Sequence, residues 1–145
     1  NLYDRKADVL TSQAPGKSVV SVKTWLTDKE QKTLGKHQFY VTYSFDNEIA
    51  KIAVMRKSWE KQSAVVSLVL PLISPNHEKV IQVSNQEVEV QKEGGRVVVS
   101  ANAPITLMKT KKNRVFNMVP GMEAVPFKID FQENIETIEC TIKVL

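Results

Sequence analysis

The segment at the carboxyl end constrains the fold most, because its apolar and polar residues alternate without interruption. From Ile138 to Val144, every second residue is apolar. A period of two places successive side chains on opposite faces, as in a β-strand with one buried face. Cys140 is the only cysteine, and it is in phase with Ile142, so its side chain is predicted to point inward. The same pattern recurs along most of the chain and predicts an all-β fold.

Length and composition fit one globular domain. A chain of 145 residues can bury a sizeable core, and fractions of 42% hydrophobic and 25% charged residues are ordinary for a globular protein. A single cysteine excludes an intramolecular disulfide framework, although it does not identify the compartment. No apolar run approaches the roughly 18 residues that a membrane span requires, so we expect no membrane insertion.

We expect residues 1–17 to form an approach segment or linker, and residues 18–145 to form a single β-sandwich domain. The chain begins with Asn1 rather than methionine, which favours a fragment of a longer protein. The segment from Gln13 to Gly16 predicts a turn before the first long strand.

Short alternating segments separated by turn residues fill the rest of the chain. The predicted strands are residues 18–26, 38–45, 49–55, 63–70, 80–83, 87–91, 96–100, 105–108, 114–119, 127–131 and 136–144. The segment from Ser63 to Leu70 is apolar on both faces, which predicts a central strand that ends at Pro71. About ten short strands at these intervals are typical of an antiparallel two-sheet β-sandwich, a jelly roll or a related fold.

The apolar residues that share a phase within each predicted strand form the expected core. They are Val20, Val22, Leu26, Phe39, Val41, Tyr43, Phe45, Val66, Leu68, Val88, Val90, Val97, Val99, Ile138, Cys140, Ile142 and Val144.

The sequence contains no recognisable catalytic constellation. A nucleophilic triad needs a base beside its nucleophile, and His37 and His77 are the only histidines. Both fall in polar segments that we interpret as solvated loops, and no serine lies in a Gly-x-Ser-x-Gly motif. Glu87 and Glu89 share one strand face, like a glycosidase pair, but they are expected to be solvated because they alternate with buried valines. We therefore expect the isolated domain not to be an enzyme.

We also expect no metal, cofactor or nucleic acid. The lone cysteine lacks the clustered partners that zinc requires. Residues 46–48 and 130–136 could supply calcium ligands, although simple turns explain both segments. The net charge of +4 comes from 20 basic and 16 acidic residues that are mixed along the chain. The basic cluster from Lys109 to Arg114 has no interleaved aromatic residues for stacking on bases.

Exposed aromatic residues are the one feature that indicates a ligand. Trp25 and Tyr40 are out of phase with the apolar residues of their strands. If these strands pair, both rings lie on one outer face with Lys23, where they could stack on sugar rings or anchor a protein. Trp59 lies among charged residues and could join this surface. Alternatively, the outer face is partly covered, and Trp25 packs under a loop or a neighbouring domain.

One stretch near the carboxyl end carries a family resemblance. The segment from Arg114 to Phe127, which runs into Lys128–Phe131, resembles the closing strands of β-sandwich accessory domains in bacterial polysaccharide lyases and related α/α-toroid carbohydrate enzymes. The resemblance implies an accessory domain of such an enzyme, and it transfers no site residue. In those enzymes the catalytic Tyr, His and Arg or Asn come largely from other domains.

Two hypotheses follow. The first is a non-catalytic module, bacterial and extracellular or periplasmic, that supports or targets carbohydrate processing. It would bind polysaccharide through Trp25, Tyr40, Lys23 and Trp59, with Lys23 meeting an acidic sugar. The alternative is a structural or protein-interaction domain of a larger protein, without a ligand of its own. In that case the exposed aromatic residues contact another domain of the same chain.

Overall fold

Strands joined by turns make up the fold, in a computed structural model that describes residues 4–58, 65–74, 78–108 and 124–145. Eleven strands lie in these ranges. They are β1 (Asp8–Ala14), β2 (Lys17–Thr27), β3 (Thr33–Asp46), β4 (Ile49–Ser58), β5 (Ser67–Ile73), β6 (Val80–Ser84), β7 (Glu87–Lys92), β8 (Gly95–Ala101), β9 (Ile105–Leu107), β10 (Ala124–Asp130) and β11 (Thr137–Val144). The described residues include no helix of the length and apolarity needed to span a membrane. The all-β prediction is confirmed.

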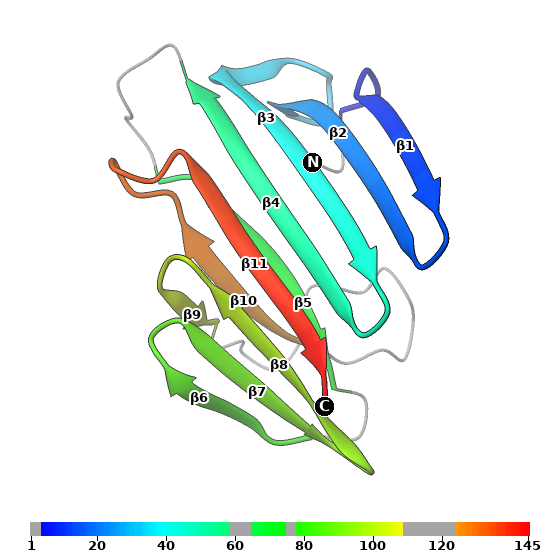
Figure 1. The fold of residues 1–145 in the computed structure, drawn as a ribbon. Coiled ribbons are helices and arrows are strands. Elements are labelled where there is room, and N and C mark those ends of the chain that lie inside the picture. Colours follow the sequence, from blue (N-terminus) through cyan, green and yellow to red (C-terminus); the bar gives the residue numbers. More distant parts are fainter. Residues whose placement is uncertain (1–3, 59–64, 75–77, 109–123) are drawn as a thin grey trace.

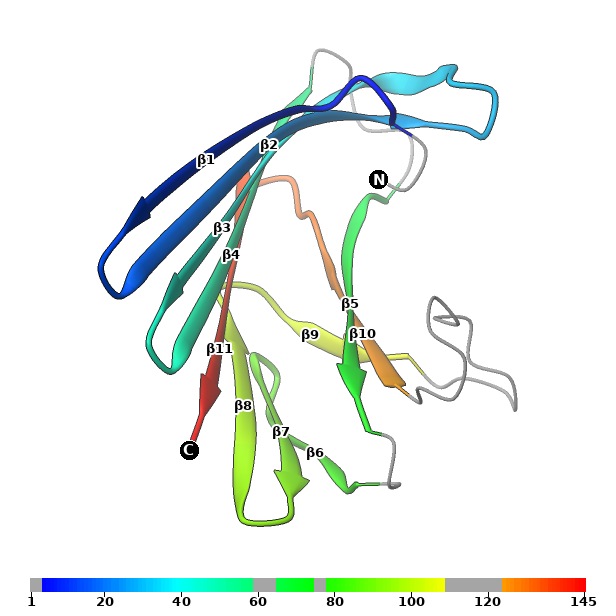
Figure 2. The same cartoon turned by 90° about the vertical axis from the view of Figure 1, so that its right-hand side faces the viewer.

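The strands form two antiparallel sheets. The larger sheet has the order β1-β2-β3-β4-β11-β8-β7-β6, and the smaller has the order β5-β10-β9. Figure 1 shows the larger sheet running from β1 at one edge to β6 at the other. In Figure 2 the smaller sheet lies to one side of the larger one. Side chains from both sheets, among them Val54 and Phe127, join one buried core, which confirms the predicted two-sheet sandwich.

Strand β11 occupies the middle of the larger sheet. Cys140 is the Cα partner of Ile52 on β4 and of Ala101 on β8. The side chains of Ile138 and Cys140 are 0% and 1% exposed, as the alternation of this segment predicts. The last strand therefore joins the meander β1–β4 to the hairpins β6–β8.

Most of the predicted core is confirmed. Six of the predicted residues are buried: Phe39, Val88, Val90, Val99, Ile138 and Cys140. Seven others are partly buried and pack against the core: Leu26, Val41, Tyr43, Val66, Leu68, Val97 and Ile142. Val20 and Val22 are half-buried, and they lie outside this core cluster.

The core prediction is wrong for two residues. Phe45 is 48% exposed and Val144 is 57% exposed. Each has the expected phase, but each lies at the end of its strand, one residue from the last position of β3 and at the last position of β11. Alternation gives the face of a side chain, and it does not show whether the facing sheet reaches that far.

The segment expected to be a linker contains a strand. Residues 8–14 form β1, which pairs with β2 from Asp8↔Lys23 to Ala14↔Lys17. The predicted turn before β2 is present, and Gly16 within it has a φ of 71°, which glycine adopts without steric cost. The approach segment thus adds an edge strand to the larger sheet.

The apolar segment predicted to be a central strand lies instead at an edge. Strand β5 is an edge strand of the smaller sheet, and β10 is the central strand. Strand β5 does not end at Pro71 but continues through it, and Pro71 is the Cα partner of Pro126 on β10. An edge position explains how proline fits, because one side of the strand forms no ladder hydrogen bonds. The strand predicted at residues 114–119 lies outside the described residues.

Truncation of Ile138 tests the central role of β11. We expect Ile138→Ala to lower the free energy of unfolding by about 2–5 kcal/mol, because it leaves a cavity in the core. Val144→Ala on the same strand is the matched control, since Val144 is 57% exposed and its loss should cost about 0.5 kcal/mol or less. Urea unfolding followed by tryptophan fluorescence measures both. Equal losses would contradict this assignment.

Candidate functional site

The strands that carry the predicted aromatic residues pair directly. Lys23 on β2 is the Cα partner of Tyr40 on β3, and Trp25 is the Cα partner of Gln38 two positions away. Trp25 and Tyr40 therefore share one face of the sheet, opposite to the face on which Phe39 is buried. Their ligand-binding role stays a prediction, and Trp59 lies outside the described residues.

Lysines flank a row of hydroxyl groups on this face. Register places eight side chains together, which we call the outer platform: Lys17, Ser21 and Lys23 of β2, Tyr40, Thr42 and Ser44 of β3, and Lys51 and Lys57 of β4. The four lysines are exposed and the four hydroxyl residues are half-buried. Lys51 and Lys57 are about 20 Å apart along an extended strand. The platform thus presents polar groups between two rows of positive charge.

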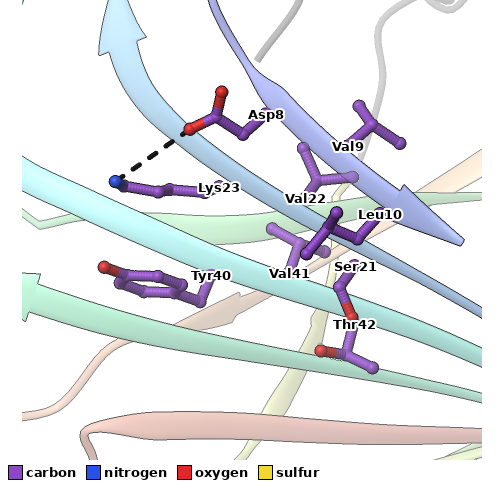
Figure 3. Close-up of a pocket in the computed structure, with 9 residues that line it drawn as sticks. All are labelled: Asp8, Val9, Leu10, Ser21, Val22, Lys23, Tyr40, Val41 and Thr42. Carbon is purple, nitrogen blue, oxygen red and sulfur yellow. Dashed lines mark ion pairs between the residues drawn. The ribbon is translucent and has the colours of Figure 1, made fainter.

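A shallow hollow of about 560 Å³ lies over the β1 end of the outer platform. Its lining comprises two rows of the outer face and the row between them: Asp8, Lys23 and Tyr40, then Val9, Val22 and Val41, then Leu10, Ser21 and Thr42. Figure 3 shows Asp8, Lys23 and Tyr40 side by side across three strands, with Leu10, Ser21 and Thr42 following in a second row. A smaller hollow of about 120 Å³ lies at the other end, beside Lys17 and Lys51.

Tyr40 is held in place by its neighbours. Its hydroxyl group donates a hydrogen bond to Oε1 of Gln38 at 2.9 Å. Lys57 Nζ lies 5.8 Å from the centroid of the Tyr40 ring, within the range of a cation–π contact. The ring is half-buried. Tyr40 is therefore a positioned aromatic side chain on an open face.

Lys23 remains available to an anion. Its ammonium group lies 4.0 Å from Asp8 Oδ2, with 45% of the Lys23 side chain and 75% of the Asp8 side chain exposed. An exposed pair at this distance contributes little and is screened by salt. A ligand carboxylate or sulfate could replace Asp8 at small cost.

Trp25 is positioned by an aspartate that the sequence analysis did not single out. Oδ2 of Asp4 accepts hydrogen bonds from the Thr24 hydroxyl group at 2.6 Å and from the Trp25 amide at 2.9 Å. Oδ1 of Asp4 accepts one from the Lys6 amide at 3.0 Å. Together these donors, with the Thr24 hydroxyl group first, hold the pKa of Asp4 below its usual value. This contact, which we call the Asp4 latch, fastens the chain before β1 to β2.

His37 is not the solvated loop residue that the sequence predicted. It lies within β3 as the Cα partner of Ser58, and its Nδ1 is buried without a hydrogen-bond partner among the residues that the structure describes. Two positions from Phe39, it belongs to the inner face rather than to the outer platform. His77 lies outside the described residues.

The two glutamates that share a face of β7 lie apart from the outer platform on β2–β4. Glu87 and Glu89 alternate with buried Val88 and Val90 as predicted, but both are half-buried, and Glu89 pairs with Arg96 at 3.3 Å instead of being solvated. Among the described residues, no three His, Cys, Asp or Glu side chains form a group that could hold a metal ion.

The comparison with known families decides the identity of this fold. The family model described as the ulvan lyase C-terminal domain matches residues 1–145. The chain belongs to this family. The resemblance to accessory domains of polysaccharide lyases, predicted from residues 114–131, is thereby confirmed.

This chain spans less than a quarter of the length of the relatives described next. The broad-specificity ulvan lyase of Formosa agariphila is 32% identical over 149 residues, which are 100% of this chain and 23% of the relative. A heparan sulfate lyase from Pedobacter heparinus has a TM-score of 0.68 at 8% identity, covering 96% of this chain and 22% of that one. Heparinase III has a TM-score of 0.64 at 9% identity, covering 96% and 21%. At these identities the two solved structures show a shared fold.

Several residues of the site could not be predicted from the alternation of apolar and polar residues within one strand. Asp8 and Leu10 reach it through β1, whose residues are all exposed and give no burial alternation. Lys51 and Lys57 reach it only through the register of β4 on β3. The sequence of β1 gives no clear signal, because its apolar residues Val9 and Leu10 are adjacent and do not alternate with polar residues.

The Asp4 latch predicts a pH dependence of stability in this domain. We expect Asp4→Asn to lower the free energy of unfolding by about 1–2 kcal/mol at pH 7, because a charged acceptor is lost. Because folding lowers the pKa of Asp4, its charged carboxylate stabilises the fold above the unfolded-state pKa of 3.8. This contribution is lost as the pH falls through the lower pKa of the folded state. The two proteins should therefore converge below pH 3.8.

Urea unfolding between pH 7 and pH 3 measures this difference. Asp8→Asn is the matched control, because among the described residues the side chain of Asp8 makes just the exposed pair with Lys23. A constant difference between Asp4→Asn and the parent protein over the whole pH range would refute a role for the Asp4 charge.

Proposed function

We propose that this domain is a non-catalytic part of a polysaccharide lyase and binds an acidic polysaccharide along the outer platform. The observation that carries the proposal is the Lys23–Tyr40 pair, flanked by Lys57 on the face opposite to the buried Phe39. Since the curated relative is an ulvan lyase, ulvan is the polysaccharide to test first. A bacterial protein exported to the periplasm or outside the cell would meet such a substrate.

The chemistry of the outer platform suits a charged sugar chain. An aromatic ring can stack on the C–H face of a sugar, and the half-buried Tyr40 ring loses little freedom on binding. The hydroxyl groups of Ser21, Thr42 and Ser44 can hydrogen-bond to sugar hydroxyl groups. The lysine rows on β2 and β4 would attract carboxylate or sulfate groups over about 20 Å.

The same face offers no support for catalysis. The outer platform holds lysines, hydroxyl groups and one tyrosine, and the carboxylates Asp8 and Asp46 lie at its margin. His37 belongs to the opposite face. We therefore assign bond cleavage to other parts of the parent lyase.

A structural role is the second candidate. Its support is that the curated relative is more than four times as long as this chain, so that the domain would have neighbours within a parent protein. In that case the outer platform has no ligand.

Affinity electrophoresis of the domain in gels containing ulvan tests the first proposal. We expect ulvan to retard the domain and added salt to weaken the retardation, because exposed charges are screened. Tyr40→Ala should weaken binding by about fivefold, corresponding to about 1 kcal/mol of ring contact, while Tyr40→Phe should retain most of it. The double change of Lys23→Ala and Lys57→Ala should weaken binding further.

Lys79→Ala is the charge control, since Lys79 is exposed and precedes β6 at the far edge of the larger sheet. Circular dichroism verifies that each variant is folded. The proposal fails if ulvan does not retard the domain, or if Lys79→Ala weakens binding as much as the double lysine change.

A further inference from the structure

The inner face of the larger sheet is apolar beyond the part that the smaller sheet covers. Register aligns Val9, Val22, Val41, Val54 and Ile138 across β1, β2, β3, β4 and β11. Ile138 and Val54 are 0% and 5% exposed, Val41 and Val22 are half-buried, and Val9 is 57% exposed. Burial thus declines strand by strand toward β1, while the residues remain valine or isoleucine.

A second row repeats this decline. Cys140 and Ile52 are 1% and 8% exposed, whereas their aligned neighbours Tyr43 and Val20 are half-buried. One row further along, Phe45 is 48% exposed. We call the exposed and half-buried end of these rows the inner apolar face: Val9, Val20, Val22 and Phe45.

The arrangement of the sheets explains the decline. In Figure 2 the smaller sheet stands opposite β11 and β8, and the turn between β1 and β2 reaches away from it. The inner apolar face is therefore continuous with the core, but it extends past the smaller sheet. Contiguous exposed apolar residues rimmed by polar ones, here Thr11, Gln13 and Ser18, are typical of a surface that contacts another protein unit.

We propose that the inner apolar face docks onto the remaining part of the parent lyase chain. The family is a C-terminal domain, and this chain corresponds to only 23% of the curated relative, so the larger part of such a lyase is available as a partner. The two solved lyases carry the same fold within chains of which it is 22% and 21%. Docking would complete the core of the sandwich along β1–β3.

The apolar character of the face favours this occupant over the polysaccharide. Val9, Val22 and Phe45 offer no hydrogen-bonding side chains for sugar hydroxyl groups, whereas burial of such residues favours protein association. The proposal also leaves the outer platform open, because Val9 and Leu10 are adjacent on β1 and point to opposite faces. The docking therefore does not depend on whether the platform binds polysaccharide.

Thiol labelling of the full-length lyase, without polysaccharide, tests the proposal. Val9→Cys places a thiol on the inner apolar face, and Leu10→Cys places the matched control on the outer face of the same strand. Both residues are exposed in the domain, at 57% and 74%. A charged maleimide should modify Val9→Cys about tenfold or more slowly than Leu10→Cys, because a thiol under a docked surface reacts only when the contact opens.

The native cysteine of this domain adds only a small background. Cys140 is buried, and burial raises the pKa of its thiol to about 11, so little reactive thiolate forms at pH 7. The rate measured for the unsubstituted lyase is subtracted for cysteines elsewhere in the chain. Phe45→Cys and Asp46→Cys form a second inner and outer pair if the β1 variants fold poorly.

Three results would overturn the proposal. Equal and fast labelling of Val9→Cys and Leu10→Cys would show an uncovered inner face. Equal protection of both would place the contact over the whole edge strand instead. Protection of Val9→Cys that disappears on dilution of the lyase would identify a second copy as the occupant.

Discussion

The sandwich depends on the antiparallel pairing of β11 with both β4 and β8. Cys140 aligns with Ile52 on one side and with Ala101 on the other, so one strand joins segments far apart in sequence. Without β11, the meander β1–β4 and the hairpins β6–β8 would be two separate sheets with unpaired edges. Pairing between such distant segments stabilises the fold only when most of the chain has already folded, which favours cooperative folding. The full burial of Ile138 reflects this central position.

Alternation in the sequence predicts well where the strands lie and on which face each side chain points. It predicts poorly whether the opposite sheet covers that side chain. Phe45 and Val144 have the phase of core residues but are exposed, because the smaller sheet does not reach the ends of their strands. Conversely, Phe127 and Ile129 are 0% exposed and were absent from the predicted core, although the strand that carries them was expected. They lie on the central strand of the smaller sheet, and this position depends on strand order. Strand order is set by contacts between distant segments, which a local pattern does not contain.

The candidate site shows the same division between local and distant information. The shared face of Trp25 and Tyr40 follows from phase once β2 and β3 pair, and these strands are consecutive. Lys57 and Asp8 come from the two flanking strands, so their approach to Tyr40 and Lys23 required two further registers. Hydrogen bonds between distant groups, such as the Asp4 latch, leave no periodic signal at all. The alternation within single strands therefore predicts the residues at the centre of such a site more readily than those that flanking strands contribute.

The two proposed surfaces are opposite faces of the same strands, so both depend on one set of registers. A slip of β1 by one residue would exchange Val9 for Leu10 on the inner side and alter the hydrophobic contact and the hollow together. The turn between β1 and β2 opposes this slip, and the turn between β3 and β4 opposes a slip of β4 on β3. Gly16 between β1 and β2 has a φ of 71°, and Asn47 between β3 and β4 has a φ of 47°, a region that most other residues adopt at a cost. Turn geometry thus sets which side chains meet the core, and the strict alternation of a strand then determines which side chains remain for a ligand.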